Sequence, residues 1–192
     1  MSLRRSLLRW VYPFLMFVNS RKKGNVIEGD HPPITSFYDL SATLNSGEVV
    51  AFSAFRNRKV LVVNTASDCG YTHQYKALKQ LAEIYPKLVI LLFPSNDFKE
   101  QERGSDEAIA QFCETQYGLN LPLMKKCVVR DKEGSHPVYQ WLSGSAQNGW
   151  NDLAPQWNFW KYLINEKGHL THVMQSGVDP LSKTMRDALQ LH

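Results

Sequence analysis

Apolar residues gather in two short, unbroken runs in the first half of the chain, and a helical pattern lies between them. Residues 59–65 include four consecutive apolar side chains, which is typical of a strand buried on both faces. A second run, 88–93, has the same character and ends at Pro94. Between the two, apolar residues share one face over 74–85, which predicts an amphipathic helix. This order predicts two parallel strands joined by a helix.

The second half of the chain continues the alternation with shorter elements. A helix is predicted over 106–117, with Ser105 as its N-cap and Gly118 at its C-terminal end. The pattern that follows predicts a strand over 126–130, a short helix over 138–142, a hairpin of strands 162–165 and 170–175, and a closing helix over 181–191. Together these elements predict an α/β fold with a central mixed sheet and helices on both faces.

Length and composition are those of one globular domain. The chain has 192 residues, of which 43% are hydrophobic and 21% are charged. Its three cysteines, Cys69, Cys113 and Cys127, are too few and too far apart for a disulfide scaffold or a tetrahedral zinc site. Thr72 stands where a C-x-x-C motif beginning at Cys69 would have its second cysteine, which disfavours a dithiol–disulfide reductase.

The net charge of +4 belongs to the N-terminus. Residues 1–30 contain six basic and two acidic side chains, so the rest of the chain carries sixteen of each sign. A domain without an excess of basic residues lacks the electrostatic footprint of a nucleic-acid-binding protein. We therefore expect no nucleic-acid partner.

An apolar run over 10–18, with basic residues on both sides, marks the N-terminal segment 1–23. The run is shorter than the roughly 20 apolar residues that a membrane-spanning helix needs. Three alternatives stay open: an uncleaved anchor on a membrane surface, an export signal, and a helix that packs on its own domain. They correspond to a membrane-associated, a periplasmic or a cytoplasmic protein. Residues 24–33 contain two glycines and two prolines and are predicted to be a linker, which leaves 34–192 as the domain.

Cys69 lies where the first apolar strand gives way to the helix, and this position suggests chemistry. Unpaired N–H groups and the helix dipole near a helix N-terminus favour a thiolate over a thiol. The thiolate is the nucleophilic form of cysteine, so the position suggests redox or acyl chemistry. A cysteine that only packs at the end of a strand is the alternative.

Three further motifs lie near the ends of the predicted elements. Residues 93–98 (Phe-Pro-Ser-Asn-Asp-Phe) follow the second strand, 101–104 (Gln-Glu-Arg-Gly) open the next helix, and 156–159 (Gln-Trp-Asn-Phe) precede the hairpin. Loops after parallel strands lie at the same edge of a sheet, where the thiol also lies. The indole N–H of Trp157 and the amide of Asn158 are two donors that can stabilise a thiolate and orient a peroxide against it.

These motifs resemble those of the glutathione peroxidase family, in the family's order and at nearly its spacing. Four other stretches share the resemblance: 36–40, 64–72, 112–113 and 122–123. The resemblance covers about Ile34 to the C-terminus and implies a thioredoxin-like fold, a peroxidase activity on hydroperoxides, and no cofactor. It also implies that Cys69 is the peroxidatic residue and that Trp157 and Asn158 are its hydrogen-bonding pair.

The same resemblance bears on one acid and two further cysteines. The family's loop usually reads Pro-Cys-Asn-Gln-Phe, and this chain has Ser95 for the cysteine and Asp97 for the glutamine. An ionised Asp97 beside the thiolate would destabilise the thiolate. Three alternatives follow: Asp97 points away from the thiolate, Asp97 is protonated, or this subgroup of the family distributes the catalytic roles differently among its residues. Cys113 lies where thioredoxin-dependent relatives have a resolving cysteine, and a core cysteine is the alternative. Cys127 matches no cysteine of the family and is interpreted as a packing residue.

The resemblance further implies a catalytic cycle and its partners. Cys69 would become a sulfenic acid, condense with Cys113 to a disulfide, and be recycled by thioredoxin or glutathione. The stretch between Trp141 and Trp157 lacks the insertion of tetrameric relatives, so we expect a monomer with an open site for lipid hydroperoxides. The rival functions are a peroxide sensor or relay, which passes its disulfide to a partner protein, and a non-catalytic binding module.

Overall fold

The computed structural model of the chain describes residues 26–130 and 134–190. The predicted N-terminal segment, 1–23, lies outside the described residues, so its three interpretations stay predictions. None of the helices in the described part is long and apolar enough to cross a membrane.

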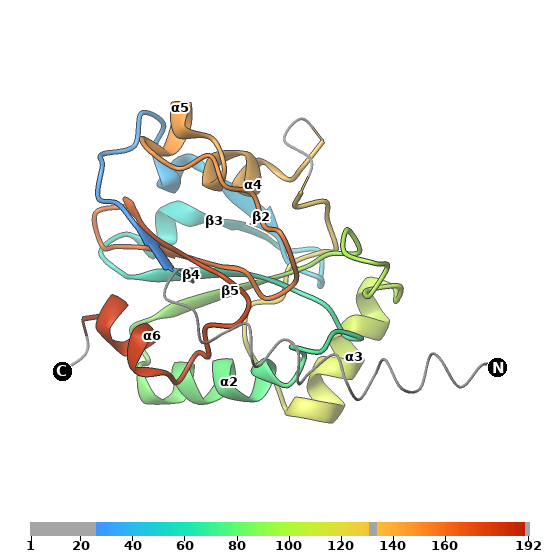
Figure 1. Cartoon of the computed structure of the whole chain (residues 1–192). Helices are drawn as coiled ribbons and strands as arrows, with labels where there is room; N and C mark the ends of the chain where they lie inside the picture. Colours follow the sequence, from blue (N-terminus) through green and yellow to red (C-terminus); the bar gives the residue numbers. More distant parts are fainter. Residues whose placement is uncertain (1–25, 131–133, 191–192) are drawn as a thin grey trace.

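A five-stranded mixed sheet forms the centre of the molecule (Figure 1). β4 (Val60–Thr65) and β5 (Val89–Pro94) run parallel, and every residue in both is buried, as their apolar runs predict. β6 (Lys161–Ile164) and β7 (Leu170–Met174) form the predicted antiparallel hairpin, and β6 also pairs with β4. β1 (Val26–Glu28) lies at one edge, which gives the strand order β1-β7-β6-β4-β5.

Helices cover both faces of this sheet (Figure 1), which confirms the predicted α/β architecture. α2 (Gln74–Ile84), α3 (Asp106–Tyr117) and α6 (Lys183–Ala188) pack on one face, where they share an apolar core. α4 (Pro137–Leu142) contributes to a second core on the other face, and α5 (Ser145–Asn148) follows it. α6 is shorter than the predicted closing helix, and α5 was not predicted.

α3 begins and ends at the predicted residues. The Ser105 hydroxyl oxygen accepts a hydrogen bond from the Ala108 N–H at 3.3 Å, as an N-cap does. Gly118 has a φ of 55°, in the left-handed region, and its N–H donates to the carbonyl oxygens of Cys113 and Glu114. The last turn of α3, which begins at Cys113, is therefore closed by a glycine cap.

The predicted strand over 126–130 is wrong, because this segment has no regular strand. Side-chain carboxylates accept hydrogen bonds from backbone N–H groups that a strand would use for pairing. Asp106 accepts from the Lys126 N–H at 2.7 Å, and Asp97 accepts from the Val129 N–H at 2.7 Å. The Cys127 N–H does donate to the Pro94 carbonyl oxygen at 3.0 Å, but this single bond beside the bonds to the carboxylates makes no strand.

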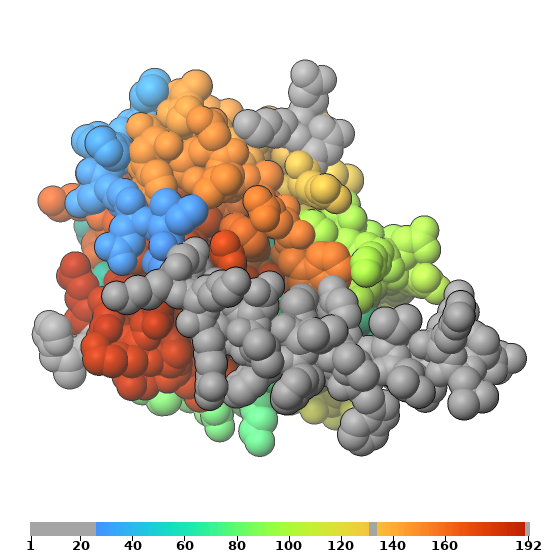
Figure 2. Space-filling model, viewed as in Figure 1, coloured from blue at the N-terminus to red at the C-terminus, as the bar shows by residue number. Residues whose placement is uncertain are grey.

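Part of the predicted linker, 24–33, belongs to the sheet, because Val26–Glu28 is the edge strand β1. The Gly29 N–H then donates to the Thr171 carbonyl oxygen at 2.9 Å. A Cβ atom on Gly29 would lie 2.6 Å from the Trp150 ring, so this glycine permits close packing. In Figure 2 the blue segment that follows β1 lies against the orange segment around α4 and α5.

Four short elements within 37–55 were not predicted. Two 3₁₀ turns, Phe37–Asp39 and Phe52–Phe55, flank a hairpin of β2 (Ser41–Thr43) and β3 (Val49–Ala51). Each element has only three or four residues, so hydrophobic periodicity cannot reveal it. The two turns pack into the same core as α4.

Candidate active site

Cys69 lies in a turn between β4 and α2. Its N–H donates to Thr72 Oγ1 at 3.0 Å, and the Thr72 N–H donates back to the Cys69 carbonyl oxygen at 3.0 Å. Thr72 Oγ1 also donates to the Ala66 carbonyl oxygen at 2.8 Å. Thr72, which stands in place of the second cysteine of a C-x-x-C motif, therefore builds the turn that presents the thiol.

The surroundings of the half-buried Cys69 thiol act on its pKa in opposite directions. Burial raises the pKa and is the largest effect. The Tyr71 N–H, 3.5 Å from the sulfur, and the side chains of Asn158 and Trp157 lower the pKa through hydrogen bonding, whereas the Asp68 carboxylate raises it. The net shift is upward. The Tyr71 N–H does favour the thiolate, as expected near the start of a helix, but burial outweighs it and the net direction is opposite to the expected one.

Asn64, near the end of β4, holds the loop that carries Trp157 and Asn158. Its Nδ2 donates to the Trp157 carbonyl oxygen at 3.0 Å, and its Oδ1 accepts from the Trp160 N–H at 3.0 Å. Its own carbonyl oxygen accepts from the Phe159 N–H at 2.6 Å. Phe159 has a φ of 64°, which a non-glycine residue adopts only when its surroundings impose it. The strand that leads to the thiol thus also positions its two predicted donors.

Gln101 is the residue that the structure adds to the predicted site. Its Oε1 accepts a hydrogen bond from Asn158 Nδ2 at 3.0 Å, and its carbonyl oxygen accepts from the Asp68 N–H at 3.0 Å. These bonds connect the turn that carries Cys69 to the loop that carries Asn158. In the sequence Gln101 stands out only as part of a motif, and the signal that could have identified it is an amide able to pair with the amide of Asn158.

Asp97 directs its carboxylate to another segment. Its Oδ2 accepts hydrogen bonds from the N–H groups of Val129 at 2.7 Å and Arg130 at 2.9 Å. Of the three interpretations of Asp97, this geometry favours the one in which it points away from the thiol. Gln101, and not Asp97, is the side chain that meets Asn158.

Aromatic and basic side chains border the site. The rings of Phe98 and Trp157 pack with their centres 5.8 Å apart. Lys99 Nζ lies 5.5 Å from the centre of the Trp157 ring, and Arg130 Cζ lies 5.9 Å from the centre of the Phe98 ring. The rim next to Trp157 is therefore apolar with two positive charges over it.

All three cysteines are free thiols. Cys113 is buried on α3 in the core against which Cys69 also packs, and burial raises the pKa of Cys113 to about 11. Cys127 packs against the core of the opposite face, and burial raises its pKa to about 12. Within the two described ranges, no group of three or more His, Cys, Asp or Glu side chains is arranged to hold a metal ion.

A hollow of about 260 Å³ lies between the segment that precedes Cys69 and α3. Ser67 and Asp68 line one side of the hollow, residues 100–104 form its floor, and Ile109 and Phe112 of α3 line the other side. The hollow therefore lies between the segment that leads to Cys69 and the helix that carries Cys113, and neither cysteine lines it.

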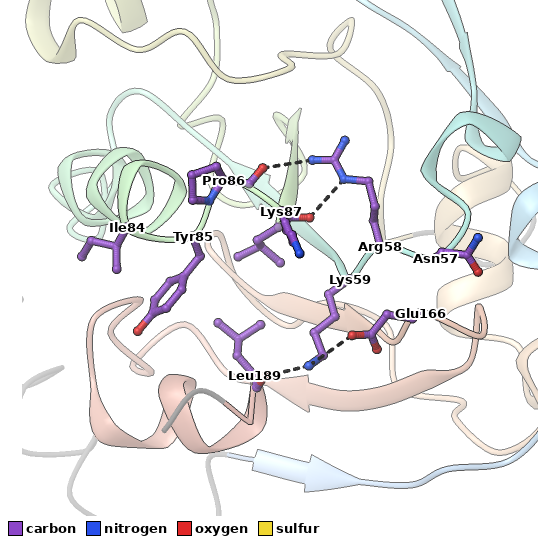
Figure 3. A pocket seen from close by; sticks show the side chains of 10 residues that line it. Asn57, Arg58, Lys59, Ile84, Tyr85, Pro86, Lys87, Glu166 and Leu189 are labelled. Carbon is purple, nitrogen blue, oxygen red and sulfur yellow. Dashed lines mark hydrogen bonds and ion pairs between the residues drawn. The ribbon is translucent and has the colours of Figure 1, made fainter.

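A larger hollow of about 380 Å³ lies at the opposite end of β4 (Figure 3). Arg58 Nε donates to the Lys87 carbonyl oxygen at 3.0 Å, and Lys59 Nζ donates to the Leu189 carbonyl oxygen at 2.8 Å. Lys59 also pairs with Glu166 at 3.5 Å. These contacts tie β4 to the ends of α2 and α6, and none of the predicted site residues lines this hollow.

Comparisons with known proteins agree with this geometry. The family model for glutathione peroxidase matches residues 37–143. The chain is 40% identical over 148 residues to the glutathione peroxidase homolog BsaA of Halalkalibacterium halodurans, covering 76% of this chain and 93% of that one. It is 44% identical over 140 residues to the glutathione peroxidase-like peroxiredoxin gpx1 of Schizosaccharomyces pombe, covering 71% and 87%.

A solved structure, the crystal structure of Trgpx in apo form, superimposes with a TM-score of 0.61 at 31% sequence identity. The superposition covers 81% of this chain and 95% of the other, so the fold is thioredoxin-like throughout the matched part. The family model matches more than half of the chain and includes the turn that carries Cys69. The chain therefore belongs to the glutathione peroxidase family, and it is a peroxidase.

Proposed function

We propose that this protein is a thiol peroxidase in which Cys69 reduces hydrogen peroxide and organic or lipid hydroperoxides. The Cys69 thiolate attacks the terminal peroxide oxygen, an S–O bond forms and the O–O bond breaks. The leaving oxygen takes a proton and departs as water or an alcohol, and Cys69 becomes a sulfenic acid. The hydrogen bonding of Trp157 and Asn158 toward the Cys69 sulfur carries this proposal, because such donors stabilise the thiolate and the charge on the leaving oxygen.

Cys113 is proposed as the resolving cysteine that converts the sulfenic acid to a disulfide. Cys113 is buried at 2% exposure, so the last turn of α3 has to open before the two sulfurs meet. Gly118 closes that turn, and the end of a helix is a segment of low local stability. A hollow lined by Phe112, the neighbour of Cys113 in α3, and by Ser67 and Asp68 supports this proposal, because it leaves space between α3 and the segment before Cys69.

A thioredoxin-type protein is the proposed reductant, and glutathione is the alternative. The relative from Schizosaccharomyces pombe is named a peroxiredoxin, which favours a protein dithiol over glutathione. A dithiol protein reduces an internal disulfide by thiol–disulfide exchange through a mixed disulfide. Reduction returns Cys69 and Cys113 to free thiols, the state in which both are found.

The test is a peroxidase assay with thioredoxin and with glutathione on wild type, Cys69→Ser and Cys113→Ser. Cys69→Ser should lose turnover with either reductant because the nucleophile is gone. Cys113→Ser should form the sulfenic acid at the wild-type rate but lose thioredoxin-linked turnover by about tenfold or more. Cys127→Ser is the matched control and should keep wild-type turnover.

Full thioredoxin-linked turnover in Cys113→Ser would contradict the two-cysteine mechanism. A stoichiometric mixed disulfide with a partner protein, without repeated turnover, would instead identify the protein as the peroxide sensor or relay. The assay therefore separates the proposed enzyme from its rival.

The proposed setting of the reaction is a membrane surface, with the protein as a monomer acting on lipid hydroperoxides. The apolar, basic sequence of 1–23 supports the membrane association. The rim formed by Phe98 and Trp157, with Lys99 and Arg130 over the rings, supports an apolar substrate with an anionic group.

A further inference from the structure

Tyr75 of α2 connects the two parts of the molecule that carry the reactive cysteines. Its side chain is buried at 0% exposure in the core that α2 and α3 share. Its ring centre lies 5.3 Å from that of Phe159 on one side and 5.3 Å from that of Tyr117 on the other. Phe159 belongs to the loop beside Cys69, and Tyr117 ends the helix that carries Cys113. One ring therefore packs against both.

The Tyr75 hydroxyl has an unusual environment for a buried polar group. It interacts with the Cys113 thiol and the Thr65 hydroxyl, yet no hydrogen bond of normal geometry to it forms among the described residues. The Thr65 hydroxyl is likewise buried without a partner. Because an unpaired buried hydroxyl lowers stability, its presence beside a thiol indicates a partner that forms in another state of the protein.

We propose that Tyr75 is a positioning residue for resolution: its hydroxyl donates a hydrogen bond to the Cys113 sulfur as that sulfur becomes a thiolate, and it keeps this bond while the last turn of α3 opens toward Cys69. The inference rests on the proposed role of Cys113 as the resolving cysteine. A neutral thiol is a weak acceptor, which agrees with the missing hydrogen bond in the reduced protein. A thiolate is a charged acceptor, and a charge-assisted hydrogen bond is roughly twice as strong as a neutral one.

The resolving step needs no further reactant. Cys113 gives its proton to solvent, and its thiolate sulfur attacks the sulfur of the Cys69 sulfenic acid. The S–S bond forms as the S–O bond breaks, and the leaving hydroxide takes a proton from solvent and departs as water. The Cys113 sulfur is oxidised and the sulfenic sulfur is reduced. Tyr75 keeps its proton throughout.

Three titratable groups face Cys113 within the described residues. Burial raises the pKa of Cys113 to about 11, and the interaction with the Tyr75 hydroxyl of α2 acts in the opposite direction. The Glu102 carboxylate, in the loop before α3, raises the pKa. Tyr117, at the end of α3, interacts with the same thiol. Of these three, Tyr75 is the one whose interaction lowers the pKa of Cys113 and so favours the thiolate that resolution requires.

The test is Tyr75→Phe, which removes the hydroxyl and keeps the ring between Phe159 and Tyr117. Sulfenic acid formation should proceed at the wild-type rate. Disulfide formation should slow by about tenfold near neutral pH for each unit by which the pKa of Cys113 rises, and it should recover at higher pH. Both steps are followed by rapid quenching with a thiol-alkylating reagent and mass spectrometry of the intact protein over a range of pH.

Tyr139→Phe is the matched control. Tyr139 is also fully buried with an unpartnered hydroxyl, but it lies in the core on the opposite face of the sheet. This variant should keep the wild-type rate and pH profile of both steps. Because neither hydroxyl makes a hydrogen bond of normal geometry to a described residue, both variants should fold, with melting temperatures at or above the wild-type value.

Two results would overturn the assignment of Tyr75. One is a wild-type rate and pH profile of disulfide formation in Tyr75→Phe. The other is an equal slowing at every pH, which would indicate packing alone. A failure of the proposed resolving role would look different, because wild type itself would then form no disulfide between Cys69 and Cys113.

Discussion

Asn64 illustrates how a single polar residue in an apolar strand organises chemistry at the residue scale. It is buried at 0% exposure, and its amide and carbonyl groups bond the backbone of Trp157, Phe159 and Trp160. A buried polar side chain is more informative than any of its apolar neighbours, because it has to be paired. Here the pairing holds the two predicted donors beside Cys69.

Asp97 supports the backbone, so its loss should affect stability and not chemistry. In Asp97→Ala the N–H groups of Val129 and Arg130 lose their acceptor. We expect the free energy of unfolding to fall by roughly 1–2 kcal/mol. The rate constant for the reaction of Cys69 with peroxide should stay close to the wild-type value. Urea denaturation and stopped-flow kinetics measure the two quantities.

Asp97→Asn is the matched control, since it keeps one side-chain oxygen as an acceptor and should recover part of the lost stability. A large loss of the peroxide rate constant in Asp97→Ala, with the fold intact, would instead place Asp97 in the catalytic machinery.

At the scale of elements, the strand β6 begins with a lysine that is buried within the sheet. Lys161 is at 0% exposure, between Val63 of β4 and Met174 of β7. Its Nζ donates to the Phe159 carbonyl oxygen at 2.8 Å. Burial lowers the pKa of Lys161 to about 7, against which Asp179 acts weakly in the opposite direction. The strand thus supports the loop beside Cys69 with a group that is costly to protonate.

This lysine should make the stability of the protein depend on pH. Its pKa is about 7 in the folded state and 10.5 in its ordinary state, so the unfolded chain binds more protons between these values. Stability rises with pH wherever the unfolded state binds more protons. Relative to Lys161→Met, wild type should therefore become more stable as pH increases from about 7 toward 10.5.

Urea denaturation of both proteins across this range measures the difference, and groups common to both cancel. The replacement also removes the hydrogen bond to Phe159, which shifts the difference equally at every pH. A difference in unfolding free energy that stays constant with pH would show that Lys161 does not titrate in the folded protein.

On the scale of the whole molecule, the two ends of the parallel pair β4 and β5 differ. The loops that follow these strands, and the loop before β6, converge on Cys69 at one end. The other end is tied to α2 and α6 through Arg58 and Lys59 (Figure 3). The proposed active site therefore lies at the end of the sheet where these loops meet, and contacts with α2 and α6 hold the opposite end.

The proposed membrane association concerns the whole chain, so it is tested on the intact protein. Six basic residues within 1–30 should bind the intact protein to vesicles that contain phosphatidylglycerol. Binding should weaken as the salt concentration rises from about 0.05 to 0.5 M, because exposed charges are then screened. Vesicle sedimentation measures the bound fraction, with phosphatidylcholine vesicles as the control. Equal binding to both vesicles, or none to either, would contradict the electrostatic anchor.

A structural element could be predicted from the sequence where residues close together in the chain are enough to form it. β4, β5 and the hairpin of β6 and β7 follow from their apolar runs and turn, and α3 follows from Ser105 and Gly118. The strand expected over 126–130 failed because carboxylates at Asp97 and Asp106 bind its N–H groups. The sequence of 126–130 does not show that distant carboxylates will bind its N–H groups in place of a neighbouring strand.

The candidate site also has features that local sequence predicts and features that only the folded chain creates. The sequence by itself determined the family, because its motifs resemble those of the family in order and spacing, and it predicted Cys69 as the reactive cysteine with Trp157 and Asn158 as its donors. The tertiary structure alone decided that Gln101 meets Asn158, 57 residues away in the chain, and that Asp97 does not. It also decided the direction of the Cys69 pKa and the position of Tyr75 beside Cys113. Burial and hydrogen bonding between distant segments exist only once the chain is folded.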